Sequence, residues 1–342
     1  MDKNLIRVVC LAVICLSASL SICGQSVSSP KVQTPKSIFV FHTNEFWLNL
    51  HHFLYVLARA ENKEKDSLRE AVANAPADQE SKLVKLSAAE KQTWRKAIAW
   101  YVSGPARKDL VFDDPLPAVT NALARSENAV SLKGSDVDAS FATILESAAA
   151  IYRKAWWKQH QAANEKWQKT TERLVNLHGV RVLSVITNAY QMQWPVAGFP
   201  VHVSAYSNWA GAYSTKGNLL VLASLDRNLQ GEYGLETVFH EGMHQWDEQI
   251  QDALIEVAQK INKYFPRGLS HALIFFTAGE AVRSVNPVHV PYAEKSGVWQ
   301  RGLSQFRVAL DETWKPYLDG HGTRDEAFAE LIKRTAVKPN PD

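Results

Sequence analysis

Seven apolar residues recur at intervals of three or four between positions 235 and 257: Leu235, Phe239, Met243, Trp246, Ile250, Leu254 and Val257. An α-helix turns once in about 3.6 residues, so residues with this spacing lie on one face. The spacing predicts a long amphipathic helix whose apolar face packs against a core. The rest of the chain must supply the apolar elements that cover this face.

Composition is that of a globular protein with a sizeable core. Of 342 residues, 46% are hydrophobic and 21% are charged, and the formal net charge is +3. The sequence has no basic stripe, and so small a net charge gives no reason to expect a nucleic-acid partner. Eleven tryptophans are many for this length, and the simplest use for them is in the core.

The N-terminus resembles a secretory signal rather than part of the fold. Lys3 and Arg7 precede an apolar run over residues 8–22, and a polar stretch follows without a stop-transfer pattern. We predict a signal peptide over residues 1–24, a linker over 25–36, and a secreted or periplasmic location. An uncleaved N-terminal membrane anchor and a lipid-modified Cys23 are the alternatives.

Cysteine usage agrees with this interpretation. All three cysteines, Cys10, Cys15 and Cys23, lie in or at the edge of the predicted signal. A mature chain that starts at Gln25 has no cysteine, so it uses none as a nucleophile or metal ligand. It also lacks Asp2, Lys3 and Arg7, which changes the net charge from +3 to +2.

Helical patterns dominate an N-terminal region, residues 37–179. Apolar residues recur at helical spacing from Phe46, a capping-box pattern opens a second helix at Ser87, and a long helical pattern over 139–178 ends at Gly179. We assign a second region to residues 180–342 and expect the two regions to pack as one unit.

Strand patterns open the second region. The segments 180–186, 199–206 and 218–225 are rich in β-branched and aromatic residues and predict a small sheet. Helical pattern returns near Glu232, and a capping box at Thr323 opens the last helix. The predicted fold is α+β and predominantly α-helical, with a small sheet before the helix of residues 235–257.

That helix also carries His-Glu-x-x-His, formed by His240, Glu241 and His244. Positions four apart on a helix differ by about 40° in direction, so both imidazoles can meet one ion. Glu241, offset by about 100°, can flank the ion and act as a general base. Gly242 is unfavourable inside a helix and suggests a close approach by another backbone. The alternative is an amphipathic helix that contains two histidines by coincidence.

This motif resembles that of the zincin metallopeptidases. In that family an edge strand lies over the cleft and pairs with extended substrate, and the next helix carries His-Glu-x-x-His. The apolar run 218–225 followed by the motif is similar to that order. The resemblance covers roughly residues 200–295 and implies one bound Zn²⁺ and hydrolysis by attack of a zinc-bound water. The third histidine of the metzincin pattern is absent, because position 250 is isoleucine.

The third ligand is expected from the segment 269–285. Glu280 is a carboxylate within a run that is apolar enough to be buried, and a buried carboxylate needs a partner such as zinc. We predict Glu280 as the ligand, with an ion pair to Arg283 as the alternative. His271 competes for the role. It lies nine residues earlier, so a continuous helix points it away from Glu280.

Further residues near the motif are candidates for catalysis, for orienting a ligand, or for binding substrate. A Glu as third ligand resembles the gluzincin subgroup, and Tyr292 lies where that subgroup places a catalytic tyrosine, although Ser284 stands where its usual Asp would be. Asp247 or Glu248 can orient a ligand histidine. The stretch from Asn208 to Tyr213 predicts either a substrate-lining strand or a hairpin. We expect structural or surface roles for His42, His51, His52, Glu326 and Glu330.

The sequence therefore predicts a secreted zinc metallopeptidase of gluzincin type, acting on peptide or protein. His240, His244 and Glu280 would bind zinc, with Glu241 as general base and Tyr292 as a catalytic donor. A zinc hydrolase of a non-peptide bond uses the same machinery. A non-enzymatic helical binding protein is the second alternative. The sequence does not indicate an oligomeric state.

Overall fold

The computed structural model describes residues 37–61, 82–215, 217 and 219–336. The predicted signal peptide, the linker and Cys23 lie outside these residues. Within the described part of the chain, no helix has both the length and the apolar character that crossing a membrane requires.

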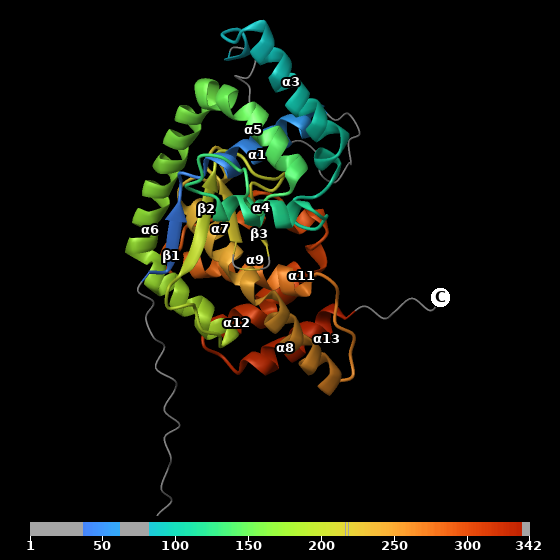
Figure 1. The fold of residues 1–342 in the computed structure, drawn as a ribbon. Coiled ribbons are helices and arrows are strands. Elements are labelled where there is room, and N and C mark those ends of the chain that lie inside the picture. Colours follow the sequence, from blue (N-terminus) through green and yellow to red (C-terminus); the bar gives the residue numbers. More distant parts are fainter. Residues whose placement is uncertain (1–36, 62–81, 216, 218, 337–342) are drawn as a thin grey trace, which may run out of the picture. The chain divides into compact units, whose positions relative to one another are not determined.

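Four strands form one mixed sheet in the order β1-β2-β4-β3 (Figure 1). They are β1 (Phe39–His42), β2 (Phe199–Ser204), β3 (Ala212–Thr215) and β4 (Leu219–Ala223). β1, β2 and β4 are parallel, whereas β3 runs antiparallel to β4 and forms an edge. The predicted α+β fold, mainly helical with a small sheet before the motif helix, is confirmed.

The two faces of the sheet belong to two different cores. Successive side chains of a strand point to opposite faces. Val203 and Leu220 therefore pack with the C-terminal helices, while Tyr213 and Val221 pack with the N-terminal helices. The sheet thus lies between the two cores, and the boundary predicted at 179/180 falls inside a continuous helix, Lys158–Tyr190.

The N-terminal helices behave largely as their patterns predict. They are α1 (Phe46–Glu61), α3 (Ala88–Ser103), α4 (Leu116–Arg125) and α5 (Ala139–Tyr152), with a short 3₁₀ turn at Pro105–Arg107. The predicted capping box at Ser87 is present: the Glu90 amide donates to the Ser87 hydroxyl, and the Ser87 amide donates to the Glu90 carboxylate.

The predicted end of a helix at Gly179 and the predicted strand at 180–186 are both wrong. A π-helical turn (Arg153–Trp157) leads into α6 (Lys158–Tyr190), which continues through both positions. Val182 and Ile186 are buried four residues apart, so packing of a helical face outweighs their β propensity. A Cβ on Gly179 would lie 2.8 Å from Ile38 Cδ1, so this glycine permits close packing rather than a helix end.

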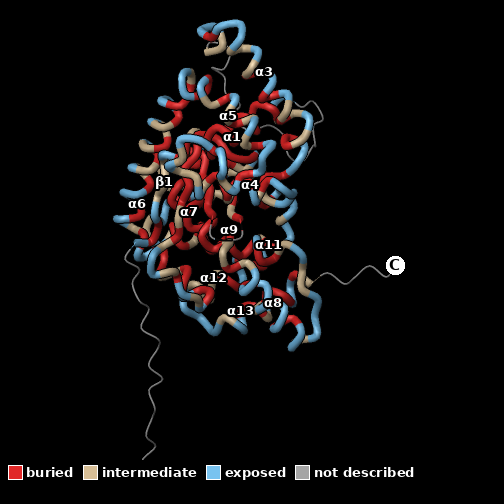
Figure 2. Tube along the Cα trace, in the orientation of Figure 1, coloured by how far each residue is buried: buried red, intermediate tan, exposed pale blue. Residues whose placement is uncertain are grey.

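The long helix predicted around the motif is present in two parts. α7 (Glu232–Met243) ends in a 3₁₀ turn (His244–Trp246), and α8 (Asp247–Lys260) follows directly. All seven residues of the apolar stripe are buried, within the interior that Figure 2 shows in red. The remaining elements are η3 (Arg227–Leu229), α9 (Leu269–Arg283), α10 (Tyr292–Lys295), η5 (Trp299–Arg301), α11 (Ser304–Ala309), a π turn (Leu310–Trp314), α12 (Lys315–Leu318) and α13 (Arg324–Thr335).

Gly242 provides a test of this packing. A Cβ at this position would lie 2.4 Å from Cη2 of Trp194, so a side chain, not a backbone, makes the close approach. The Trp194 indole donates a hydrogen bond of 2.9 Å to the carbonyl of Ile38 and is held in place. We expect the close contact with Trp194 to lower the free energy of unfolding of Gly242→Ala by about 1–3 kcal/mol. The higher helix propensity of alanine should offset about 1 kcal/mol of this loss.

Urea denaturation measures this change. Gly104→Ala is the matched control, because a Cβ there would meet nothing within 4 Å and should change stability little. An increase in stability for Gly242→Ala would contradict the packing described here.

Candidate metal centre

Three imidazoles converge at the C-terminal end of α7. One nitrogen from each of His240, His244 and His271 lies within 4.8 Å of the others. The Nε2 atoms of His240 and His244 are 3.1 Å apart and face each other. Imidazole nitrogens so disposed can bind a single metal ion, although the geometry does not identify which metal.

The local fold explains how these rings meet. His240 lies in the last turn of α7, and His244 opens the 3₁₀ turn that follows. His271 is the third residue of α9, a helix that packs along α7. His240 is buried, His244 is partly buried and His271 is exposed, so the cluster is open to solvent on the His271 side.

Electrostatics favour the neutral, metal-binding form of His240. Burial lowers the pKa of His240 well below its ordinary value, and the neighbouring His244 and His271 lower it further. His244 differs, because its hydrogen bond to Asp247 and the charge of Glu241 together outweigh burial and raise its pKa.

Asp247 is the predicted orienting carboxylate. Its two oxygens lie 3.0 and 3.1 Å from Nδ1 of His244, which leaves Nε2 directed at His240. A carboxylate on the second nitrogen fixes the tautomer and orientation of a ligand histidine. Nδ1 of His240, by contrast, is buried without a hydrogen-bond partner among the described residues.

Phe275 forms the apolar wall of the cluster. Its ring centroid lies 4.1 Å from that of His240 and 4.7 Å from that of His271. It comes one turn after His271 on α9, which explains why it covers the same face. In the sequence, Phe275 is only one residue of an apolar run, so its contact with the histidine rings could not be predicted.

Glu241 lies beside the cluster and is held by the edge strand. It is 5% exposed, and its carboxylate accepts a 2.5 Å hydrogen bond from the Ser214 hydroxyl of β3. Burial raises the pKa of Glu241, while His244 and Ser214 oppose that rise. A carboxylate with a raised pKa is suited to accept a proton near neutral pH.

Glu280, the predicted third ligand, lies outside the cluster. Its carboxylate is 2.9 Å from the Arg283 guanidinium and 3.8 Å from the Lys315 ammonium. Glu280 and His271 are nine residues apart on the continuous helix α9, so they point to opposite sides. His271 therefore replaces Glu280 in the candidate ligand set. The ion pair with Arg283, which is the alternative prediction for Glu280, accounts for the charge of this carboxylate.

Tyr292 lies near the cluster through Phe275. Their rings are stacked with centroids 6.4 Å apart. The Tyr292 amide donates to both carboxylate oxygens of Glu236 at 2.9 Å, and Glu236 also bonds His289 at 2.6 Å. This buried carboxylate, one turn before His240, fixes the start of α10. The catalytic role of Tyr292 stays a prediction.

The segment from Asn208 to Tyr213 leads into β3, which forms a hairpin with β4. The edge of the sheet is therefore β3 rather than the apolar run 218–225, whose strand β4 lies between β2 and β3.

The three histidines for which the sequence predicts structural or surface roles have partners in the structure. His51 bonds the Tyr101 hydroxyl at 2.8 Å, and His52 lies between Ser204 and Tyr213. His42 pairs with Glu127 and stacks on His202.

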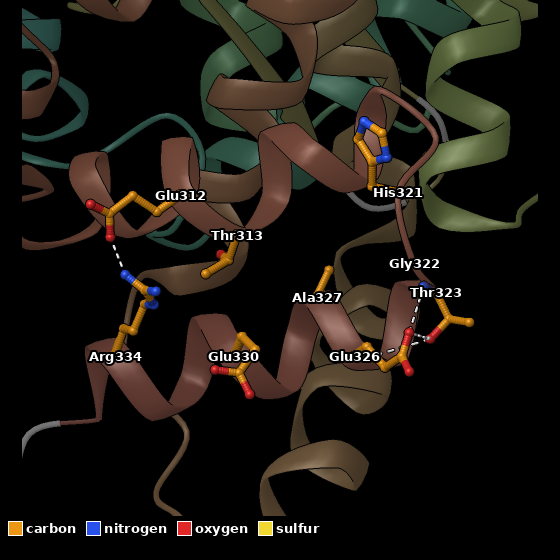
Figure 3. Close-up of a pocket in the computed structure, with 9 residues that line it drawn as sticks. All are labelled: Glu312, Thr313, His321, Gly322, Thr323, Glu326, Ala327, Glu330 and Arg334. Atoms are coloured by element: carbon orange, nitrogen blue, oxygen red, sulfur yellow. Dashed lines mark hydrogen bonds and ion pairs between the residues drawn. The ribbon is translucent and has the colours of Figure 1, made fainter.

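The acidic residues of α13 also have ordinary explanations. Glu326 completes the capping box with Thr323, and Glu330 pairs with Lys333 at 2.7 Å. Figure 3 shows them along a shallow pocket with Glu312 and Arg334. The structure thus gives both residues the capping and surface roles that the sequence predicts.

Comparisons of the chain with family models, with characterised proteins and with solved structures find no match.

Asp247→Asn tests the orienting bond. An amide can present its NH₂ to Nδ1 and so favour the other tautomer of His244, which places the hydrogen on Nε2. We expect the affinity of the site for a divalent metal ion to fall about 10-fold to 100-fold, measured by competition with a chromophoric chelator. Glu248→Gln, one residue away, is the control, and equal affinity for Asp247→Asn and the wild type would contradict this role.

Proposed function

We propose that this protein is a zinc-dependent hydrolase, most simply a metallopeptidase, with His240, His244 and His271 as metal ligands. The observation that carries the proposal is the convergence of these three histidines beside a buried glutamate. Three protein ligands leave one position free for water or substrate, as catalytic zinc sites require. Structural zinc sites are instead closed by four protein ligands.

The donor set suits zinc. Imidazole nitrogens bind zinc well, whereas magnesium and calcium prefer oxygen ligands. Zinc held here would lower the pKa of bound water to about 7 and polarise a substrate carbonyl. We propose peptide or protein as substrate because the motif resembles that of the zincins. A non-peptide ester or amide remains the second candidate, since the same residues serve either bond.

Glu241 would supply the general base. Its carboxylate is fixed beside the imidazoles by Ser214, and it would take a proton from the attacking water and return it to the leaving amine. The opening beside His271 is the face from which substrate would enter. With the predicted signal peptide, we propose that this chemistry occurs outside the cytoplasm, in a secreted or periplasmic protein.

Metal analysis of single variants tests the ligand set. We expect purified protein to contain one zinc ion per chain and His271→Ala, like His240→Ala, to lose it, because two imidazoles hold zinc weakly. Glu280→Gln is the matched control on the same helix and should retain zinc. Zinc retained by His271→Ala and lost from Glu280→Gln would overturn this ligand set.

Glu241→Gln separates binding from catalysis. We expect this variant to keep its zinc and to lose at least about 100-fold in kcat, the range for removal of a general base. Cleavage of a denatured protein or a peptide mixture, followed by mass spectrometry, measures the activity. Full activity in Glu241→Gln would exclude Glu241 as the base.

A further inference from the structure

Ser214 occupies a distinctive place on the edge strand. Side chains alternate along β3, so its neighbours Tyr213 and Thr215 face the N-terminal helices while Ser214 faces α7. Its hydroxyl lies 2.5 Å from Oε2 of Glu241 and 2.9 Å from the Glu241 carbonyl oxygen. A hydroxyl has one proton, and the shorter contact is to the carboxylate, which is the stronger acceptor when ionised.

The strand that carries Ser214 is itself fixed. β3 pairs with β4 along four residues, and the side-chain amide of Gln245 donates a hydrogen bond of 3.5 Å to the Thr215 carbonyl. The hydroxyl is therefore presented by a rigid element rather than by a free loop. A group held in this way can restrict the rotation of the glutamate that it contacts.

Glu241 needs such a restraint. The Glu241 carboxylate is close enough to His244 to interact with its charge. A carboxylate so placed is itself a possible zinc ligand, and a glutamate bound to the metal cannot act as a base. It must lie close enough to accept a proton and yet stay out of the ligand set. Phe275 packs against the His240 ring, but its side chain has no polar atom that could hold a carboxylate by a hydrogen bond.

We propose that Ser214 is a positioning residue that holds Glu241 in the orientation of a general base and away from the metal. This inference rests on the proposed function. It assigns to the edge strand a side-chain role in catalysis, in addition to any backbone pairing with substrate.

Ser214→Ala tests the proposal through kcat. We expect kcat to fall about 10-fold to 100-fold, part of the contribution of a well-placed base, with KM changed less than about twofold. Ser214→Thr restores the hydroxyl and should recover most of kcat. Thr215→Val is the matched control, because it removes the adjacent hydroxyl, which contacts Asn121 on the other face of β3.

Cobalt substitution gives a readout that does not depend on turnover. We expect the visible spectrum of Co²⁺-loaded Ser214→Ala to differ from that of the wild type, because Glu241 is released towards the ion. In a Glu241→Ala background the same substitution should leave the spectrum unchanged. A structural role for Ser214 would instead alter the spectrum in both backgrounds.

The outcomes separate the two proposals. Wild-type kcat and spectrum in Ser214→Ala would overturn the positioning role and leave the hydrolase proposal intact. A spectral change that persists without Glu241 would overturn it as well. Wild-type protein that binds neither zinc nor cobalt would overturn the proposed function and, with it, this inference.

Discussion

The antiparallel packing of α7 against α9 is the contact on which the candidate site depends. At one end of the pair, His271 of α9 meets His240 and His244. At the other end, Gly279 of α9 lies so close to Pro291 that a Cβ would be 2.5 Å from it, and Glu236 of α7 is nearby. The absence of a side chain at position 279 allows this approach. A shift of one helix along the other would separate His271 from its partners.

Two buried glutamates of α7, Glu236 and Glu241, have different hydrogen-bond partners. Burial raises the pKa of Glu236, and its hydrogen bonds to His289 and to the Tyr292 backbone amide oppose that rise. Glu241 accepts a hydrogen bond from the Ser214 hydroxyl. It lies beside His240, whose pKa is lowered by burial, and His244, whose pKa is raised by its hydrogen bond to Asp247. The first arrangement fixes a loop, whereas the second leaves a carboxylate able to accept a proton. The two glutamates stand five residues apart on α7, and only their surroundings give them different roles.

Much of this arrangement was predictable from local patterns. Helical spacing predicts the apolar stripe and brings together the two histidines of the motif. The Ser/Thr-x-x-Glu pattern predicts the capping boxes at Ser87 and Thr323. The predictions over 180–186 were wrong because β-branched residues also fit the buried face of α6, where tertiary packing decides. β1 was missed because four residues carry too little periodicity to signal a strand.

Local patterns could not identify His271 as the third member of the candidate metal site, for a related reason. Helical spacing shows that His271 and Glu280 point to opposite sides of α9, but not which side meets α7. The segment is apolar nearly all round, so its pattern marks no single packed face. The answer depends on how α9 packs against α7 in the folded chain, where the side without a side chain at Gly279 lies next to Glu236. Ser214 was missed similarly, since its role depends on which strand forms the edge.

X-ray absorption at the zinc edge of the metal-loaded protein tests the central claim most directly. The proposed zinc site predicts three imidazole nitrogens at about 2.0–2.1 Å, with the multiple scattering that histidine rings produce, and one further light atom. The His271→Ala protein, which should lose its zinc, should not show this three-imidazole signal. A wild-type spectrum with two imidazoles and a carboxylate, unchanged in His271→Ala, would contradict the three-histidine site.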